Sequence, residues 1–148
     1  MKLATWNVNS LKIRLPQLLN WLAARQPDVV CLQETKLPDQ DFPREASAAA
    51  GYHFACSGQK TYNGVALLTR EAPSDIVFGN PLFPDEQKRL LTATVQGICV
   101  VSAYVPNGQA VGSDKYDYKL RWLASLRDWL AAEARAHANL VVLGDFNI

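Results

Sequence analysis

Three short runs of apolar residues limit the folds open to this chain more than any other feature of its sequence. They lie at residues 28–33, 98–103 and 140–143, and in each run apolar side chains follow one another without polar alternation. Strands of this kind are typical of a sheet whose two faces are both covered. We therefore expect a layered α/β fold in which these runs are buried strands of a mixed sheet.

The segment between residues 2 and 33 predicts how the first strands are connected. Residues 2–6 form an expected strand, Pro16 suits the first position of a helix that reaches Arg25, and Pro27 stops this helix. This strand–helix–strand unit makes its two strands parallel, so their carboxyl ends lie at one edge of the sheet. The remaining strands are expected at residues 52–56, 64–69, 75–78 and 90–95, and the remaining helices at 44–50 and 114–136.

Composition is that of a compact, soluble domain. The 148 residues are 49% apolar and 20% charged, which suits one domain with its own core. The net charge of +1 means that any nucleic-acid contact must come from a local patch. Cys31, Cys56 and Cys99 have no CxxC spacing and are expected to be small buried side chains in a reducing compartment. Without a signal region or a membrane span, we expect a cytoplasmic protein with no membrane partner.

Polar side chains follow four of the expected strands at their carboxyl ends. They are Asn7, Glu34, Tyr104 and the pair Asp145 and Asn147. Side chains alternate along an extended backbone, so the pair should point to one side, toward the crevice where α/β sheets bind ligands. A hard cation such as Mg²⁺ takes one or two carboxylates together with phosphate and water, and Glu34 is its natural first ligand. Asp145 would activate a water that Asn147 holds, while Tyr104 and Asn7 would donate hydrogen bonds to the developing charge.

Two considerations weigh against this interpretation. Asp and Asn are also common after strands for backbone reasons, because an Asx turn closes the strand. In addition, an aspartate with an ordinary pKa of about 3.9 is a poor base near neutral pH. Its surroundings must therefore raise that pKa, or a metal must supply most of the activation.

The sequence lacks the motifs of several other classes of hydrolase. The chain has no GxxxxGK[ST] phosphate loop and no GxSxG nucleophile motif. His53 and His137 are isolated, which argues against a His-rich dinuclear phosphatase and against a zinc site. We expect both histidines to be surface or packing residues, and Trp122 and Trp129 to pack the long helix against the sheet.

A loop at residues 57–63 carries Lys60, Tyr62 and Asn63 between two expected strands. A cation and an aromatic side chain on an exposed loop suit a nucleic-acid backbone. They equally suit a plain solvated hairpin, so the loop alone does not decide between the two.

The motifs WNVNS (6–10), LQETK (32–36), YNGVALL (62–68), YVPNG (104–108) and LGDFNI (143–148) closely resemble the exonuclease III family. This family comprises bacterial abasic-site endonucleases and 3′-to-5′ exonucleases of base excision repair, and the match runs through the whole chain in family order. The resemblance implies a four-layer α/β/β/α sandwich of the endonuclease/exonuclease/phosphatase (DNase-I-like) fold. It also implies Mg²⁺ or Mn²⁺ as cofactor, and duplex DNA with abasic sites or 3′ ends as substrate.

The resemblance further implies roles for individual residues. It implies a metal site formed by Asn7, Glu34, Asp145 and Asn147, and a catalytic set formed by Tyr104, Asp145 and Asn147. In that set Asp145 transfers a proton, Asn147 positions the nucleophile or the transition state, and Tyr104 contacts the scissile phosphate. The loop with Lys60, Tyr62 and Asn63 would approach the DNA backbone.

The chain departs from the family after its GDFN motif, where the family continues through a second half with another catalytic Asp and a terminal Ser-Asp-His segment. We therefore expect residues 1–148 to be one domain that is incomplete on its C-terminal side, completed by the same or another chain. The helices at 16–25 and 114–136 are expected to cover one sheet face only, and the second sheet to lie in the absent half. Alone, the segment would then expose a large apolar patch, aggregate and be inactive.

Two other function classes remain open on the sequence alone. The first is another phosphodiesterase of the superfamily, such as a sphingomyelinase, an inositol polyphosphate phosphatase or a pancreatic-type deoxyribonuclease, since these share the Asn, Glu and Asp-x-Asn residues. The second is a non-catalytic DNA-binding fragment. The LQETK and SGQKTYNGVALL segments favour the repair nucleases over the first class, and the intact polar set argues against the second.

Overall fold

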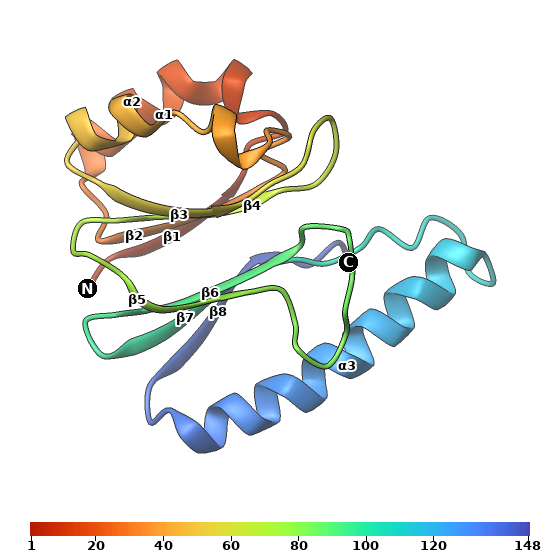
Figure 1. Ribbon diagram of the computed structural model, residues 1–148. Helices are drawn as coiled ribbons and strands as arrows, with labels where there is room; N and C mark the ends of the chain where they lie inside the picture. The colour runs from red at the N-terminus through yellow and green to blue at the C-terminus, as the bar shows by residue number, and fades with distance from the viewer.

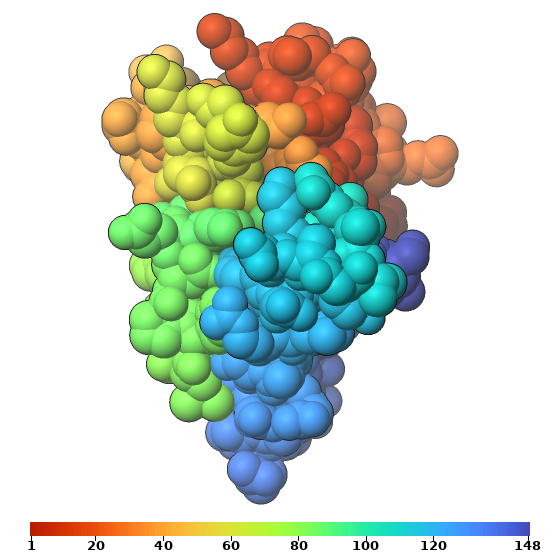
Figure 2. Space-filling model, turned by 90° about the vertical axis from the view of Figure 1, so that its right-hand side faces the viewer, coloured from red at the N-terminus to blue at the C-terminus, as the bar shows by residue number.

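Two four-stranded sheets packed face to face form the centre of the fold, and helices cover their outer sides (Figure 1). In the space-filling view the first part of the chain, red to yellow, lies above the second part, green to blue (Figure 2). The computed structural model describes residues 1–148. The first sheet, in the order β1-β2-β4-β3, consists of β1 (Leu3–Asn7), β2 (Val29–Gln33), β4 (Val65–Thr69) and β3 (His53–Ser57). The second, in the order β5-β6-β7-β8, consists of β5 (Ser74–Phe78), β6 (Leu90–Val95), β7 (Ile98–Tyr104) and β8 (Leu140–Asp145). The helices are α1 (Leu11–Arg25), α2 (Arg44–Ala49) and α3 (Asp114–Ala136), with a 3-10 turn, η1, at Asp39–Asp41.

The two sheets pack on each other through a shared apolar layer. Val29 and Leu67 of the first sheet contact Leu91 and Val100 of the second, and none of the four side chains is exposed. The expectation of a single sheet with one face uncovered is therefore wrong, because the second sheet lies within these residues. Unbroken apolar runs are typical of strands covered on both faces, but they do not tell which strands share a sheet.

The helices lie on opposite sides of this sandwich, which gives four layers (Figure 1). On the first sheet, Leu18 and Leu22 of α1 pack in the cluster that contains Leu68. On the second sheet, Trp122 and Trp129 of α3 pack in the cluster that contains Val101. The predicted packing role of the two tryptophans is confirmed, whereas the two helices cover two outer faces and not one. No helix combines the length and the apolar character needed to cross a membrane.

One helix start differs from the prediction. Helix α1 begins at Leu11, so Pro16 lies inside it and not at its first position. Leu11 is fully buried, and its backbone N–H donates to the carbonyl of Thr35 at 3.0 Å. This tertiary contact extends the helix toward its N-terminus, although an internal proline removes a helical hydrogen bond.

Parallel strand pairing brings the carboxyl ends of four strands to one region. Strand β1 pairs with β2 in parallel as predicted, and β7 pairs with β8 in parallel, with Tyr104 opposite Asp145. Strands β1 and β8 are the end strands of their sheets and lie side by side across the sandwich. Every residue of β8 keeps partial exposure, so the predicted burial of residues 140–143 on both faces is wrong. An end strand has a neighbour on one side only, which leaves its side chains half covered.

Candidate active site

Four strand ends deliver their polar side chains into one hydrogen-bonded cluster. The Nδ2 group of Asn7 donates to Glu34 Oε1 at 2.9 Å and to Asp145 Oδ2 at 2.8 Å. The hydroxyl of Tyr104 donates to the same Glu34 oxygen at 2.8 Å. Asn7 and Asp145 are 138 positions apart in the chain, so the cluster joins the first strand to the last. The convergence expected from the strand ends is thus present in the fold.

Asn147 lies next to this cluster through a turn. Its backbone N–H donates to Asp145 Oδ1 at 3.0 Å, which is an Asx turn, and its φ of 50° lies in the left-handed region. The strand ends at Asp145, so the argument from side-chain alternation does not place Asn147. Its Nδ2 donates to the carbonyl of Val105 at 2.8 Å, and Asn147 nevertheless lines the same cavity as Asp145. The Asx turn and the shared site are therefore both present.

Backbone constraints hold the carboxylates of Glu34 and Asp145 in place. Glu34 has a φ of 53°, in the left-handed region. For a residue other than glycine, this conformation costs free energy of the order of 1–3 kcal/mol. The carbonyl of Glu34 accepts a hydrogen bond from the backbone of Ser10 at 2.8 Å, which ties this turn to the start of α1. Before Asp145, a side chain on Gly144 would overlap the carbonyl oxygen of Ala103 in β7. Only glycine therefore allows β8 to approach β7 closely at the site.

Burial and hydrogen bonds together shift the pKa values of Glu34 and Tyr104 in opposite directions. Partial burial favours the neutral form of Glu34, but hydrogen bonds from Asn7 and Tyr104 and the positive charge of Lys36 outweigh it, and the net effect lowers the pKa of Glu34. Burial, together with the hydrogen bond to Glu34 and its negative charge, raises the pKa of Tyr104 to about 12. At neutral pH the cluster therefore holds an ionised carboxylate and a phenol that keeps its proton.

Two further residues, Gln33 and Lys36, support the site although the sequence predicts no role for them. The side chain of Gln33 is 1% exposed, and its Nε2 donates to Thr5 Oγ1 at 3.0 Å and to Ser102 Oγ at 3.4 Å. It therefore links the two sheets directly before Glu34. Lys36 pairs with Glu34 Oε2 at 3.4 Å. A polar residue closing an apolar strand, as Gln33 does in LQETK, was the available sequence signal for the first of them.

Two cavities meet at the cluster. One of about 800 Å³ is lined by Asn7, Asp145 and Asn147, and the other of about 490 Å³ by Glu34 and Tyr104. Asn107, which belongs to the YVPNG motif, lines both cavities. The second cavity also contains Lys36, Tyr62, Asn63, Arg89 and Lys115.

Of the three loop residues expected to approach DNA, two line the second cavity and one does not. Tyr62, which is 69% exposed, and Asn63 line the second cavity, whereas Lys60 is exposed and lies outside its lining. Three cations, Lys36, Arg89 and Lys115, face one carboxylate there, so this cavity has a local positive charge although the whole chain is nearly neutral. Arg89 also stacks over the ring of Tyr104, with its guanidinium carbon 4.7 Å from the ring centre.

The donor set suits a hard divalent cation. Glu34 and Asp145 supply carboxylate oxygens on either side of one amide group, and both face solvent-accessible cavities. Magnesium ions typically use one or two carboxylates and keep several waters, which leaves room for a substrate phosphate. The residues present therefore fit the expected Mg²⁺ or Mn²⁺ ion.

The chain is similar in sequence and in structure to known nucleases and phosphatases. Residues 4–148 match the Endonuclease/Exonuclease/phosphatase family. The chain is 36% identical over its whole length to exodeoxyribonuclease III of Haemophilus influenzae, of which it spans 58%. It superimposes with a TM-score of 0.98 and 49% identity on the 3′ phosphatase NExo from Neisseria bound to a product DNA hairpin. It superimposes with a TM-score of 0.93 and 40% identity on an AP endonuclease from Archaeoglobus fulgidus, and it covers 58% of each of these two chains.

Proposed function

Because the chain belongs to the endonuclease/exonuclease/phosphatase family, we propose that the protein containing it is a DNA repair nuclease. It would cleave phosphodiester bonds at abasic sites, remove nucleotides from 3′ ends, or do both. The family match confirms the resemblance that the motifs indicated and the four-layer fold that it implied. The observation that carries the proposal is the hydrogen-bonded cluster of Asn7, Glu34, Tyr104 and Asp145. The chain spans 58% of the length of these relatives, so the proposal concerns the whole protein.

The proposed reaction is hydrolysis of a phosphodiester. The oxygen of a water forms a bond to phosphorus and the water gives up a proton. The bond from phosphorus to the leaving sugar oxygen breaks, and this oxygen takes up a proton from solvent. Asp145 is the base that accepts this proton, and Asn147, in the same cavity, orients the water. Tyr104 keeps its proton at neutral pH, because its pKa of about 12 lies far above that range. When substrate binds, its hydroxyl would turn from Glu34 Oε1 and donate its one hydrogen bond to a phosphoryl oxygen.

The proposed cofactor is Mg²⁺ or Mn²⁺. Glu34 would be its main ligand, with Asn7, Asp145 and Asn147 around it, because an ionised carboxylate at neutral pH follows from the lowered pKa of Glu34. When bound, the cation supplies positive charge to the phosphoryl oxygens. Lys36 pairs with Glu34 at 3.4 Å and holds the second carboxylate oxygen in the cluster.

The cavity beside Glu34 is the proposed path of the DNA strand. Lys36, Arg89 and Lys115 line it, and cations are the side chains that contact phosphate oxygens. Tyr62 presents an exposed ring at the same cavity. The Neisseria relative is described as bound to a product DNA hairpin, which supports DNA as the ligand class for this chain.

Lys60 and Tyr62 are expected to contribute to DNA affinity and not to the chemical step. Replacing Lys60 by Ala removes about one phosphate contact, so the slope of log K against log salt should become shallower by about 0.9. Replacing Tyr62 by Ala removes an exposed aromatic surface and should weaken binding by about tenfold. Fluorescence anisotropy with a labelled abasic duplex at several salt concentrations measures both effects.

The matched control for these two variants is Arg127→Ala, because Arg127 is an exposed cation of α3 that lines neither cavity. Its affinity and its salt slope should equal those of the wild type. A loss of kcat in Lys60→Ala or Tyr62→Ala at unchanged DNA affinity would instead place the loop in the reaction centre.

The proposed substrate class is tested by a panel of phosphodiesters and phosphomonoesters. We expect the full-length protein to cleave abasic duplex DNA or 3′ ends in Mg²⁺ buffer, and to leave sphingomyelin and inositol polyphosphates intact. Chelation of the metal should abolish the cleavage. Turnover of the lipid or the inositol phosphate without DNA cleavage would contradict the proposal and favour another branch of the superfamily.

We further propose that residues 1–148 act as one unit with additional polypeptide, in the same chain or in a partner. The cavity that contains Asp145 and Asn147 opens between the end strands β1 and β8, and it is also lined by Thr5 and Trp6 of β1. The outer edges of both strands present backbone groups that pair with no strand of this segment, which is a surface suited to further strands.

A further inference from the structure

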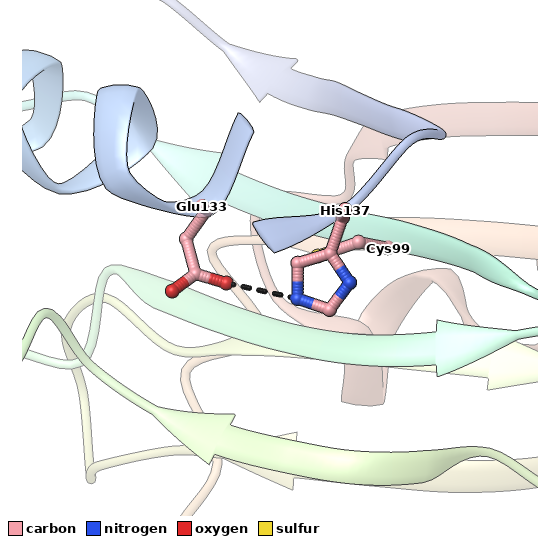
Figure 3. A group of neighbouring side chains, drawn as sticks. All are labelled: Cys99, Glu133 and His137. Carbon is pink, nitrogen blue, oxygen red and sulfur yellow. Dashed lines mark ion pairs between the residues drawn. The ribbon is translucent and has the colours of Figure 1, made fainter. Parts of the chain in front are cut away.

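A second group of potential metal ligands lies at the opposite end of β7 from the candidate active site. Cys99 at the start of β7 and Glu133 and His137 at the end of α3 each offer one ligand atom, and these atoms all lie within 4.8 Å of one another (Figure 3). Tyr104 closes the same strand five residues later, which at about 3.3 Å per residue separates the two sites by about 17 Å.

The backbone around this group is held firmly. Glu133 lies in the last turn of α3, and His137 follows the helix as its C-cap residue in an extended conformation. His137 Nε2 lies 3.2 Å from Glu133 Oε2. The backbone N–H of His137 donates to the carbonyl of Glu133 at 2.9 Å. The backbone N–H of Cys99 donates to the carbonyl of Asn139 at 2.9 Å, which fixes the connection after α3 against β7. The fold therefore positions the three side chains before any ligand binds.

The three donors are a thiol, an imidazole and a carboxylate, which together are the ligand types of zinc and not of magnesium. We propose that Cys99, Glu133 and His137 form a Zn²⁺ site in which water completes the tetrahedron and which joins the end of α3 to β7. This inference stands independently of the proposed nuclease activity. It also replaces the expectation from sequence spacing that an isolated His137 argues against a zinc site, since the partners of His137 come from two different elements.

The burial of the three groups is graded in a way that suits an ion entering from solvent. The side chains of His137 and Glu133 are 35% and 26% exposed, whereas Cys99 is only 2% exposed beneath them. Figure 3 shows the imidazole of His137 between the Glu133 carboxylate and Cys99. On binding, the bond from Cys99 Sγ to its proton breaks, a bond from Sγ to zinc forms, and the proton passes to solvent, so the charges balance. Burial and the Glu133 carboxylate raise the pKa of the Cys99 thiol, so this proton is present until the ion displaces it.

The inference is tested with Co²⁺ as a spectroscopic substitute for Zn²⁺ on the full-length protein, freed of metal by chelation and supplied with excess Mg²⁺. The candidate active site contains no cysteine, so a thiolate-to-cobalt absorption band reports on a cysteine site alone. We expect such a band at one equivalent of Co²⁺, its loss on addition of Zn²⁺, and one Zn²⁺ bound per chain in calorimetry. Zinc should also raise the Tm.

Three variants assign the band. Cys99→Ser and His137→Gln should lose it and bind Zn²⁺ more weakly, by at least the roughly 10- to 100-fold that follows removal of the outer partners of metal ligands. The matched control is Cys56→Ser, because Cys56 is a half-buried free thiol on β3 in the other sheet. His137 is partly exposed, so His137→Gln should retain the fold even if Cys99→Ser does not. Folded wild-type protein without a thiolate band, or a band that survives His137→Gln, would overturn the proposal and leave an ordinary helix-end ion pair.

Discussion

Replacing Asp145 by Asn is expected to lower the turnover of abasic-site cleavage by about 10²- to 10⁴-fold, the usual contribution of a positioned base. Replacing Glu34 by Ala is expected to lower it by orders of magnitude as well, because the cation loses its main ligand. Asn at position 145 has one side-chain oxygen, so it can accept from Asn7 or from the backbone of Asn147 but not from both, and it cannot accept the proton of the water. Ala at position 34 removes the carboxylate that is hydrogen-bonded by Asn7 and Tyr104. The measurement is kcat and KM on an abasic duplex in Mg²⁺ buffer. Because these interactions act mainly in the transition state, kcat should fall more than KM rises.

Stability measurements separate this effect from unfolding. Glu34 and Asp145 are both partly exposed, so neither substitution leaves a cavity in the core, and thermal unfolding should change little. Asp128→Asn is the matched control, because Asp128 is an exposed carboxylate of α3 whose side chain is 58% exposed. Wild-type turnover in folded Asp145→Asn or Glu34→Ala protein would refute the assignment of the cluster as the reaction centre.

Residues 1–148 expressed alone are expected to show no detectable cleavage, even at high Mg²⁺. The reason is geometric: the cavity of Asp145 and Asn147 is open between β1 and β8, and an open site leaves the water and the phosphate unpositioned. The structure changes the expected cause of aggregation, which the sequence attributed to an uncovered apolar sheet face. Because both sheets and their inner core are present, aggregation should come from the unpaired edges of β1 and β8 and not from an uncovered sheet face.

Addition in trans of the part of a relative that this chain does not cover tests the proposal that further polypeptide completes the unit. The C-terminal remainder of a relative such as the Neisseria 3′ phosphatase NExo, mixed with residues 1–148, should restore part of the activity and shift the segment toward a single species in size-exclusion chromatography. The same remainder mixed with the Asp145→Asn segment is the control and should restore the size but not the cleavage. A monodisperse and active monomer of residues 1–148 would show that the segment is a complete enzyme.

The sequence by itself determined most of the local structure and the composition of the candidate site. Helix α3 begins and ends at the predicted residues, because its apolar positions repeat at helical spacing and Ser113 caps its N-terminus by accepting a hydrogen bond from Tyr116. The parallel arrangement of β1 and β2 followed from the strand–helix–strand connection through α1. That arrangement was enough to group Asn7 and Glu34, since parallel strands end at the same edge.

Only the tertiary structure decided how the strands divide into sheets. An apolar strand is covered on both faces whether a helix or a second sheet covers it, so the pattern of residues 28–33 and 98–103 is the same in both cases. The division places β2 and β7 face to face, and it allows Gln33 to bridge from one sheet to Ser102 of the other. A pairing of this kind depends on distances between segments far apart in the chain, and sequence periodicity contains no such information.

The group at the far end of β7 illustrates the same limit. In the sequence Cys99, Glu133 and His137 have no spacing that is typical of a metal site, and His137 was expected to be an isolated surface or packing residue. Helix α3 crosses the second sheet and ends near the start of β7. This packing brings the thiol of Cys99 close to the imidazole of His137. Local patterns therefore determined which side chains stand at strand and helix ends, while the packing of α3 on the sheet decided which of these ends meet.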